Sequence, residues 1–264
     1  MTNIQYYKGV IDPTGCISNG WNLVKPNYGM YLGIALLAAV IYSCLFCISF
    51  FLVGPVMGGV YYVMLRDMRG EPVDFGMMFK GFEKFGATLA VGLVQSVPGI
   101  IYQIFDLFTN VTSTLIQLGQ QGTRGGNFYQ ESATEVAIVG GFLAAYLIFI
   151  FVYAIFSLVW AISFVFAIPL VMEHNIGPVD ALKLSARAAW SNVFGVVVLA
   201  ILVWLMLIAG VLALCIGWLF VLPLVTASFA FAYRQVFPSA APGPITYNTP
   251  PPPTEYGGSF GKGV

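Results

Sequence analysis

Residues 193–233 read VFGVVVLAILVWLMLIAGVLALCIGWLFVLPLVTASFAFAY and contain no charged side chain. A helix needs about 20 apolar residues to cross a bilayer, so this stretch is long enough for two short crossings. Three more apolar stretches cover residues 29–65, 86–108 and 136–172. Together they predict an all-α fold, a polytopic bundle of transmembrane helices.

The composition agrees with a membrane protein. The chain has 264 residues, of which 59% are hydrophobic and 8% are charged. A soluble domain typically has about 25% charged residues. The formal net charge is zero, which gives no general attraction to nucleic acid. The expected partners are therefore membrane lipids, including anionic ones, together with a protein partner or further copies of the chain.

The positions of the basic residues predict how the chain is threaded, because Lys and Arg in short loops stay cytoplasmic. We predict that 29–65 forms a hairpin with its turn near Cys44–Ser49, and that 193–233 forms another with its turn near Gly210–Gly217. The stretch 136–172 is predicted to be one long helix. Of the 11 basic residues, only Arg124 then lies on the outer side. The other ten are Lys8, Lys25, Arg66, Arg69, Lys80, Lys84, Lys183, Arg187, Arg234 and Lys262.

This threading predicts a membrane domain over residues 1–237 with both termini in the cytoplasm. Its six spans are expected at roughly 29–47, 49–66, 86–108, 136–168, 193–211 and 215–233, with one polar outer loop at 109–134. The proline-rich segment 238–264 cannot bury a core and is expected to be a disordered cytoplasmic tail. Pro250 to Pro253 could dock as polyproline II in an aromatic groove, or remain a solvated tail.

Three cytoplasmic segments are predicted to be amphipathic surface helices, at 13–24, 74–85 and 178–190. Asp74 is placed to cap the second, and Pro178 suits the first turn of the third. Such helices can float in the headgroup region or pack against the inner ends of the spans. The sequence leaves both arrangements open.

An internal similarity indicates two related modules. Trp21 precedes a hydrophobic hairpin whose second arm carries Pro55, and Trp190 precedes another whose second arm carries Pro223. Arg66 and Arg234 follow the two prolines at the same separation. Both modules begin and end on the same side, so the predicted repeat is parallel rather than inverted. Chance is the alternative, since Pro and Trp are common at membrane boundaries.

The most polar point at mid-depth is Gln95-Ser96-Val97-Pro98-Gly99 in the third predicted span. Proline removes a backbone donor, and broken helices at the midplane mark binding sites in many transporters. Gln95 and Ser96 are therefore candidate binding residues. The alternative is an ordinary kink whose freed carbonyls these side chains satisfy.

A second candidate site combines Lys183 and Arg187, one turn apart on the predicted helix 178–190. Paired positive charge there could hold an anionic lipid headgroup. We favour this lipid-facing role; the alternative is that both side chains merely extend to the membrane surface and act as topology signals. Nearby Asp180 should stabilise the helix start. The predicted apolar stripe of this helix is Leu182, Ala186 and Ala189.

The sequence offers no set of residues for catalysis, a cofactor or a metal ion. His174 is the only histidine, and no nucleophile–base pair or phosphate-binding loop is present. Cys44 and Cys47 lie three residues apart in an apolar run without a nearby histidine or carboxylate. We therefore expect the cysteines, with Cys16 and Cys215, to act as small packing residues, and the protein not to be an enzyme.

Residues 163–234 carry a recognisable pattern. AIPLVMEH at 167–174 is followed by PVDALKLSAR at 178–187, and then by Asn192, Gly217, Pro223 and Tyr233. The pattern resembles the six-span membrane proteins related to the glycerophosphodiester phosphodiesterase membrane domain. A looser similarity to the same proteins covers 18–82 and includes RGEPVDF at 69–75.

This resemblance implies a helical bundle in a bacterial or archaeal inner membrane. The enzymes of that family hydrolyse their substrate in a separate soluble barrel, for which this chain has no room. The leading expectation is thus a non-enzymatic integral membrane protein, a scaffold or accessory factor acting on lipid or partner proteins. The alternative is an uncoupled transporter or channel for a small, weakly polar solute, with Gln95 and Ser96 lining its path.

Overall fold

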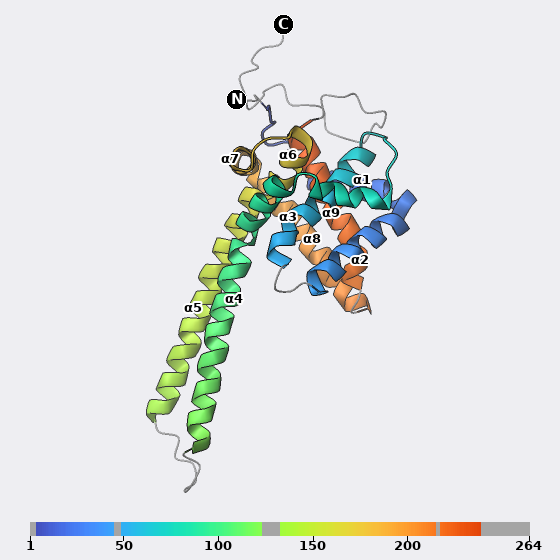
Figure 1. Cartoon of the computed structure of the whole chain (residues 1–264). Helices are drawn as coiled ribbons and strands as arrows, with labels where there is room; N and C mark the ends of the chain where they lie inside the picture. The colour runs from blue at the N-terminus through green and yellow to red at the C-terminus, as the bar shows by residue number, and fades with distance from the viewer. Residues whose placement is uncertain (1–3, 45–48, 123–132, 215–216, 239–264) are drawn as a thin grey trace. The chain divides into compact units, whose positions relative to one another are not determined.

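The structure, a computed structural model, describes residues 4–44, 49–122, 133–214 and 217–238, and its regular elements within these ranges are all helices (Figure 1). The predicted all-α class is therefore confirmed. Five described segments are long and apolar enough to cross a membrane, at Pro13–Tyr42, Phe85–Leu115, Leu143–His174, Val193–Leu212 and Gly217–Val236. The chain is thus a multi-pass membrane protein by its helix lengths and composition.

The one predicted span without a counterpart among these five is 49–66. It corresponds to the helix α3 (Ser49–Asp67). Its last two residues, Arg66 and Asp67, are charged, and its glycines and Pro55 lower its mean hydropathy. The six-span arrangement therefore stays a prediction. The predicted tail and Arg124 lie outside the described residues.

Contacts divide the chain into two units, of which unit 1 holds the residues up to Val94 and from Ile162 onward. Two hairpins form its framework: α2 (Tyr28–Cys44) with α3, and α8 (Val193–Leu214) with α9 (Gly217–Val236). The helices end where the sequence predicted the two turns. The order of elements, a short amphipathic helix and then a hairpin, agrees with the predicted repeat.

Glycines of α3 allow close packing of neighbouring segments against this helix. A Cβ atom on Gly54 would lie 1.8 Å from the carbonyl oxygen of Thr88 in α4 (Phe85–Gly122). A Cβ on Gly59 would lie 1.6 Å from the carbonyl oxygen of Met78. Any side chain at either position would force the neighbouring backbone away.

Two of the predicted surface helices pack on long helices within unit 1. The helix α1 (Pro13–Val24) lies on α9 and buries Cys16 completely, as expected for a small packing residue. The segment η2 (Phe75–Phe82) lies on α3, and the Asp74 carboxylate caps it by accepting a hydrogen bond from Gly76 N at 2.6 Å. It is a 3₁₀-helix rather than the expected α-helix. Gly76 and Gly81 weaken α-helical propensity there.

The third surface helix, α7 (Pro178–Ser191), has proline in its first turn as predicted, but its buried face is turned by one residue. The structure buries Ala181, Ser185, Ala188 and Ala189, whereas Leu182 and Ala186 are only half-buried. The predicted stripe is therefore correct at Ala189 and displaced at Leu182 and Ala186, where the buried face instead includes Ser185 and its hydrogen bonds. Ser185 Oγ donates to Ser163 O at 2.9 Å and accepts from Phe166 N at 3.1 Å.

The same serine lies at a break that the sequence did not predict. Residues 136–172 are not one helix: α5 (Ala133–Phe164) ends, and α6 (Ala167–His174) begins after a turn. Pro169 lacks the N–H that would bond to Val165 O, and its ring crowds that carbonyl. Ser185 satisfies the backbone groups on either side of the break.

Unit 2 comprises Gln95–Ala161, in which α4 and α5 run side by side as a long hairpin (Figure 1). The rings of Phe105 and Phe149 stack with centroids 3.6 Å apart, and Tyr153 donates a hydrogen bond to Pro98 O at 3.2 Å. The predicted outer loop 109–134 was wrong at its start, because α4 continues to Gly122, and residues 123–132 lie outside the described ranges. In this polar extension of α4 beyond Phe108, side-chain hydroxyls donate hydrogen bonds to carbonyl oxygens of the preceding turn, for example Thr112 Oγ1 to Phe108 O at 2.8 Å.

Candidate functional site

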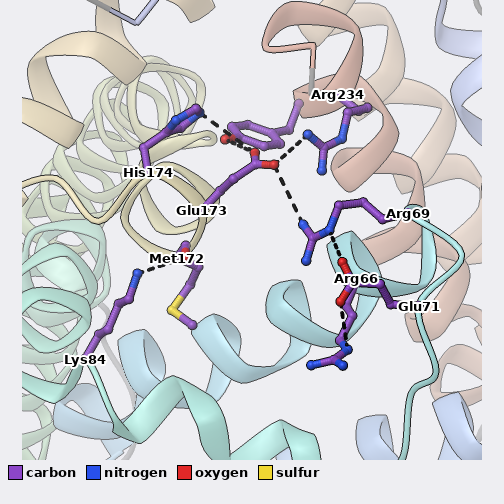
Figure 2. Close-up of polar contacts among 9 residues, drawn as sticks. Arg66, Arg69, Glu71, Lys84, Met172, Glu173, His174 and Arg234 are labelled. Atoms are coloured by element: carbon purple, nitrogen blue, oxygen red, sulfur yellow. Dashed lines mark hydrogen bonds and ion pairs between the residues drawn. The ribbon is translucent and has the colours of Figure 1, made fainter. Parts of the chain in front are cut away.

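A network of charged side chains gathers at one end of unit 1, around Glu173 in the last turn of α6 (Figure 2). Glu173 Oε1 lies 2.6 Å from Arg234 Nη1, and Oε2 accepts a hydrogen bond from the Tyr233 hydroxyl at 2.7 Å. The side chains of Glu173 and Arg234 are only 14% and 13% exposed. Because the pair is largely removed from water, its charges interact more strongly than those of a surface pair.

The segment after α3 adds a second carboxylate to this network. Glu71 Oε1 accepts a hydrogen bond from Arg69 Nε at 2.7 Å, and Oε2 lies 3.1 Å from Arg66 Nε. The hydrogen bond from Arg69 lowers the pKa of Glu71 below its ordinary value. Arg69 Nη1 lies 3.9 Å from Glu173 Oε1, so the Arg69 guanidinium joins the two carboxylates.

Lys84 joins the network by capping α6. Its ammonium donates to the carbonyl oxygens of Val171 and Met172, at 3.0 and 2.9 Å. These carbonyls belong to the last turn of α6, where no further backbone N–H can reach them. Partial burial lowers the pKa of Lys84. The chain leaves the helix through Asn175 in the left-handed conformation.

The sequence alone did not reveal the residues that surround Glu173. Arg66, Arg69 and Arg234 were interpreted only as topology signals, because nothing in a linear sequence brings residue 69 beside residue 173. The one available signal was the repeat, which places Arg66 and Arg234 at matching positions after Pro55 and Pro223.

Lys183 and Arg187 do not belong to this network. Both are exposed on α7, and neither side chain makes a hydrogen bond or ion pair with a described residue. Asp180 lies in the first turn of the same helix, as predicted. Lys183 and Arg187 therefore lie one turn apart on the exposed face of α7 and make no ion pair with Glu173.

Gln95 and Ser96 lie on an unbroken part of α4. The helix continues through Pro98, Ser96 is buried, and Gln95 is half-buried. The two cavities described below are lined by other residues.

The larger cavity lies between α2, α3 and α9 and has a volume of about 580 Å³. Its walls are almost entirely apolar. They are formed by Tyr31, Ile34, Ala35, Ala38, Ala39, Tyr42, Met57, Val60, Met64, Trp218, Leu222, Pro223, Val225 and Thr226.

The smaller cavity has a volume of about 220 Å³ and adjoins the charged network. It is lined by Tyr62, Leu65, Arg69, Met172 and Glu173. The two cavities thus differ in chemistry: the larger suits an apolar chain, and the smaller offers charged and hydrogen-bonding groups.

Comparison with family models, with curated proteins and with solved structures finds no match to this chain. The resemblance to membrane proteins of the glycerophosphodiester phosphodiesterase group therefore stays a prediction. Inference about function starts from the cavities and the charged side chains.

Proposed function

We propose that this multi-pass protein is a non-enzymatic scaffold or accessory factor of a prokaryotic inner membrane that binds lipid, with both termini in the cytoplasm. The observation that carries the proposal is the apolar cavity of about 580 Å³ between α2, α3 and α9. Ligand pockets in proteins typically have volumes of about 300–1,000 Å³. This cavity is therefore large enough for a specific occupant.

The shape of the cavity favours a single acyl chain. Its lining follows one face of α2 from Tyr31 to Tyr42, a rise of about 16 Å at 1.5 Å per residue. On α9 the lining runs from Trp218 to Thr226, a rise of about 12 Å by the same geometry. An elongated apolar space beside transmembrane helices matches an extended hydrocarbon chain.

The hydroxyl groups in the walls are already bonded within the protein. Tyr31 donates to Asp67 Oδ2 at 2.5 Å, Tyr42 to Val53 O at 3.5 Å, and Thr226 to Leu222 O at 3.1 Å. They offer little to a polar solute, so an occupant gains chiefly from apolar contact. This favours a lipid chain over the weakly polar solute of the transporter alternative.

Lys183 and Arg187 supply a second contact with lipid in this proposal. A basic residue near an anionic membrane surface contributes about 1 kcal/mol of attraction. Replacing both residues with Gln should lower the fraction of anionic lipid that the purified protein retains. Unchanged selectivity with intact folding would leave them as topology signals alone.

The acyl-chain site is tested by filling it. Ala35 and Ala39 line the cavity and are half-exposed, so Ala35→Phe/Ala39→Phe should occupy the space without disrupting the buried core. Native mass spectrometry of protein purified in mild detergent should show bound phospholipid on the unaltered chain and its loss from the filled variant. Val40→Phe, at an exposed position on the same helix, is the matched control and should retain the lipid.

Equal retention by the filled variant and the control would refute an acyl chain in this cavity. Glycerol flux into proteoliposomes provides the complementary measurement. Flux that exceeds that of protein-free vesicles and falls in a Gln95→Leu variant would favour the transporter instead.

A further inference from the structure

The smaller cavity lies on the opposite side of α3 from the acyl-chain cavity. Its residues on α3 are Tyr62 and Leu65, with Arg69 in the turn that follows the helix, whereas the larger cavity uses Met57, Val60 and Met64 of α3. Successive residues of an α-helix are rotated by about 100° (3.6 residues per turn), so the two sets point to different faces. The small cavity is therefore a separate site, and the argument for its ligand is independent of the lipid proposal.

The side chains around this cavity carry an excess of positive charge. The network in Figure 2 contains the cationic side chains of Arg66, Arg69, Lys84 and Arg234, the imidazole of His174, and the two carboxylates of Glu71 and Glu173. Both carboxylates already accept bonds from arginine. The charge that remains uncompensated is therefore cationic, and it favours a negatively charged ligand.

Arg69 is the residue best placed to contact such a ligand. Its Nε is committed to Glu71, and its Nη1 lies 3.9 Å from Glu173, beyond hydrogen-bonding distance. Neither terminal nitrogen has a hydrogen-bond acceptor among the described residues. A planar guanidinium with both terminal nitrogens available binds oxyanions through two parallel hydrogen bonds. Arg69 also lines the cavity and is 26% exposed, so a ligand can reach it.

Two neighbouring groups add donors. The Tyr62 hydroxyl accepts a bond from Arg66 Nη1 at 3.2 Å and keeps its own proton to donate into the cavity that it lines. Arg234 Nη2 is buried and has no partner within the described part of the chain. Buried donors are normally satisfied, and an oxyanion with several acceptor atoms nearby would strengthen this end of the network.

Glu173 also lines the cavity, and its negative charge would face an anion. Its two oxygens are engaged by Arg234 and Tyr233, at 2.6 and 2.7 Å, which offsets the repulsion. The site should consequently hold a compact oxyanion against Arg69 and Tyr62, the two donors that line the cavity.

We propose that the cavity between α3 and α6 binds a phosphate group, held by the Arg69 guanidinium and the Tyr62 hydroxyl. The phosphate could belong to a phospholipid headgroup or to a free phosphate compound, which share the same chemistry. Topology prediction places this end of unit 1 at the cytoplasmic face, where both are present.

The test uses the full chain in lipid nanodiscs and inorganic phosphate as the probe, with binding measured by the broadening of the ³¹P resonance of phosphate. The unaltered protein should bind, Arg69→Gln should weaken binding at least tenfold, and Tyr62→Phe should weaken it severalfold. Arg69→Lys keeps the charge but loses the paired donors, and it should fall between the unaltered protein and Arg69→Gln. Lys25→Gln, which removes an exposed basic residue elsewhere, should bind like the unaltered chain.

A second arm identifies the source of the phosphate. If phosphatidylglycerol is retained by the purified protein, is lost from Arg69→Gln and is not displaced by inorganic phosphate, the ligand is a lipid headgroup. Displacement by phosphate identifies a free phosphate compound. Equal binding by Arg69→Gln and the unaltered protein in both arms, with thermal unfolding intact, would overturn the proposal. Ala35→Phe/Ala39→Phe should leave phosphate binding unchanged, so failure of one proposal is distinguishable from failure of the other.

Discussion

Replacing Glu173 with Gln should destabilise unit 1 strongly, because it leaves the Arg234 charge without its partner. The side chains lie 2.6 Å apart and are 14% and 13% exposed. Breaking a buried ion pair by removing one partner costs about 3–5 kcal/mol. The residual exposure and the amide oxygen, which can still accept from Tyr233, reduce this to about 3 kcal/mol. For a chain of this size that corresponds to a fall of about 6–12 °C in Tm.

The measurement is the fraction of monodisperse protein that survives heating in detergent, followed by size-exclusion chromatography. Glu83→Gln is the matched control, because Glu83 Oε1 lies 2.5 Å from Lys80 Nζ but the pair is 62% and 45% exposed. An exposed pair contributes about 0–1 kcal/mol, so this control should change Tm little. The double variant Glu173→Gln/Arg234→Met should lose less than the two single variants added together. Equal Tm values for Glu173→Gln and Glu83→Gln would refute the role assigned to burial.

Three further outcomes are expected. Gly59→Ala should lower the free energy of unfolding by about 1–3 kcal/mol through overpacking. Gly29→Ala is the control and should leave it unchanged, because a Cβ at Gly29 meets no atom within 4 Å. Equal stabilities of the two variants in the heating assay would contradict the packing around α3. Lys84→Met should cost about 1–3 kcal/mol, because it leaves carbonyls at the end of α6 unsatisfied, and the same assay would detect it. Single cysteines at Gly70 and Gly177, in a chain without its native cysteines, should react with a membrane-impermeant maleimide only from the cytoplasmic side; labelling from outside would overturn the threading.

Local sequence signals predicted the boundaries of helices well. The capping carboxylate of Asp74, the proline at the start of α7 and the glycine-flanked turn before α9 each act within a few residues. Such features are visible in a linear sequence because their physical cause is local.

The errors arose where distant residues decide the structure. The break between α5 and α6 depends on Ser185 as well as on the local Pro169, and the continuation of α4 to Gly122 runs through residues whose polarity was taken as a sign of a loop. The charged network brings Arg69, Glu173 and Arg234 together from three segments that lie far apart in the sequence. A single sequence contains no signal for these pairings other than the weak repeat.

The length of α4 has a consequence for how the protein meets bilayers of different thickness. The helix has 38 residues, which rise about 57 Å. The hydrocarbon core of a bilayer is about 30 Å thick. The excess length begins at Thr109 and is largely polar, so we expect it to continue into the headgroups and water as a helix whose backbone hydrogen bonds stay satisfied. A change in bilayer thickness should then alter how far this polar end protrudes, and the apolar part of the helix need not be strained.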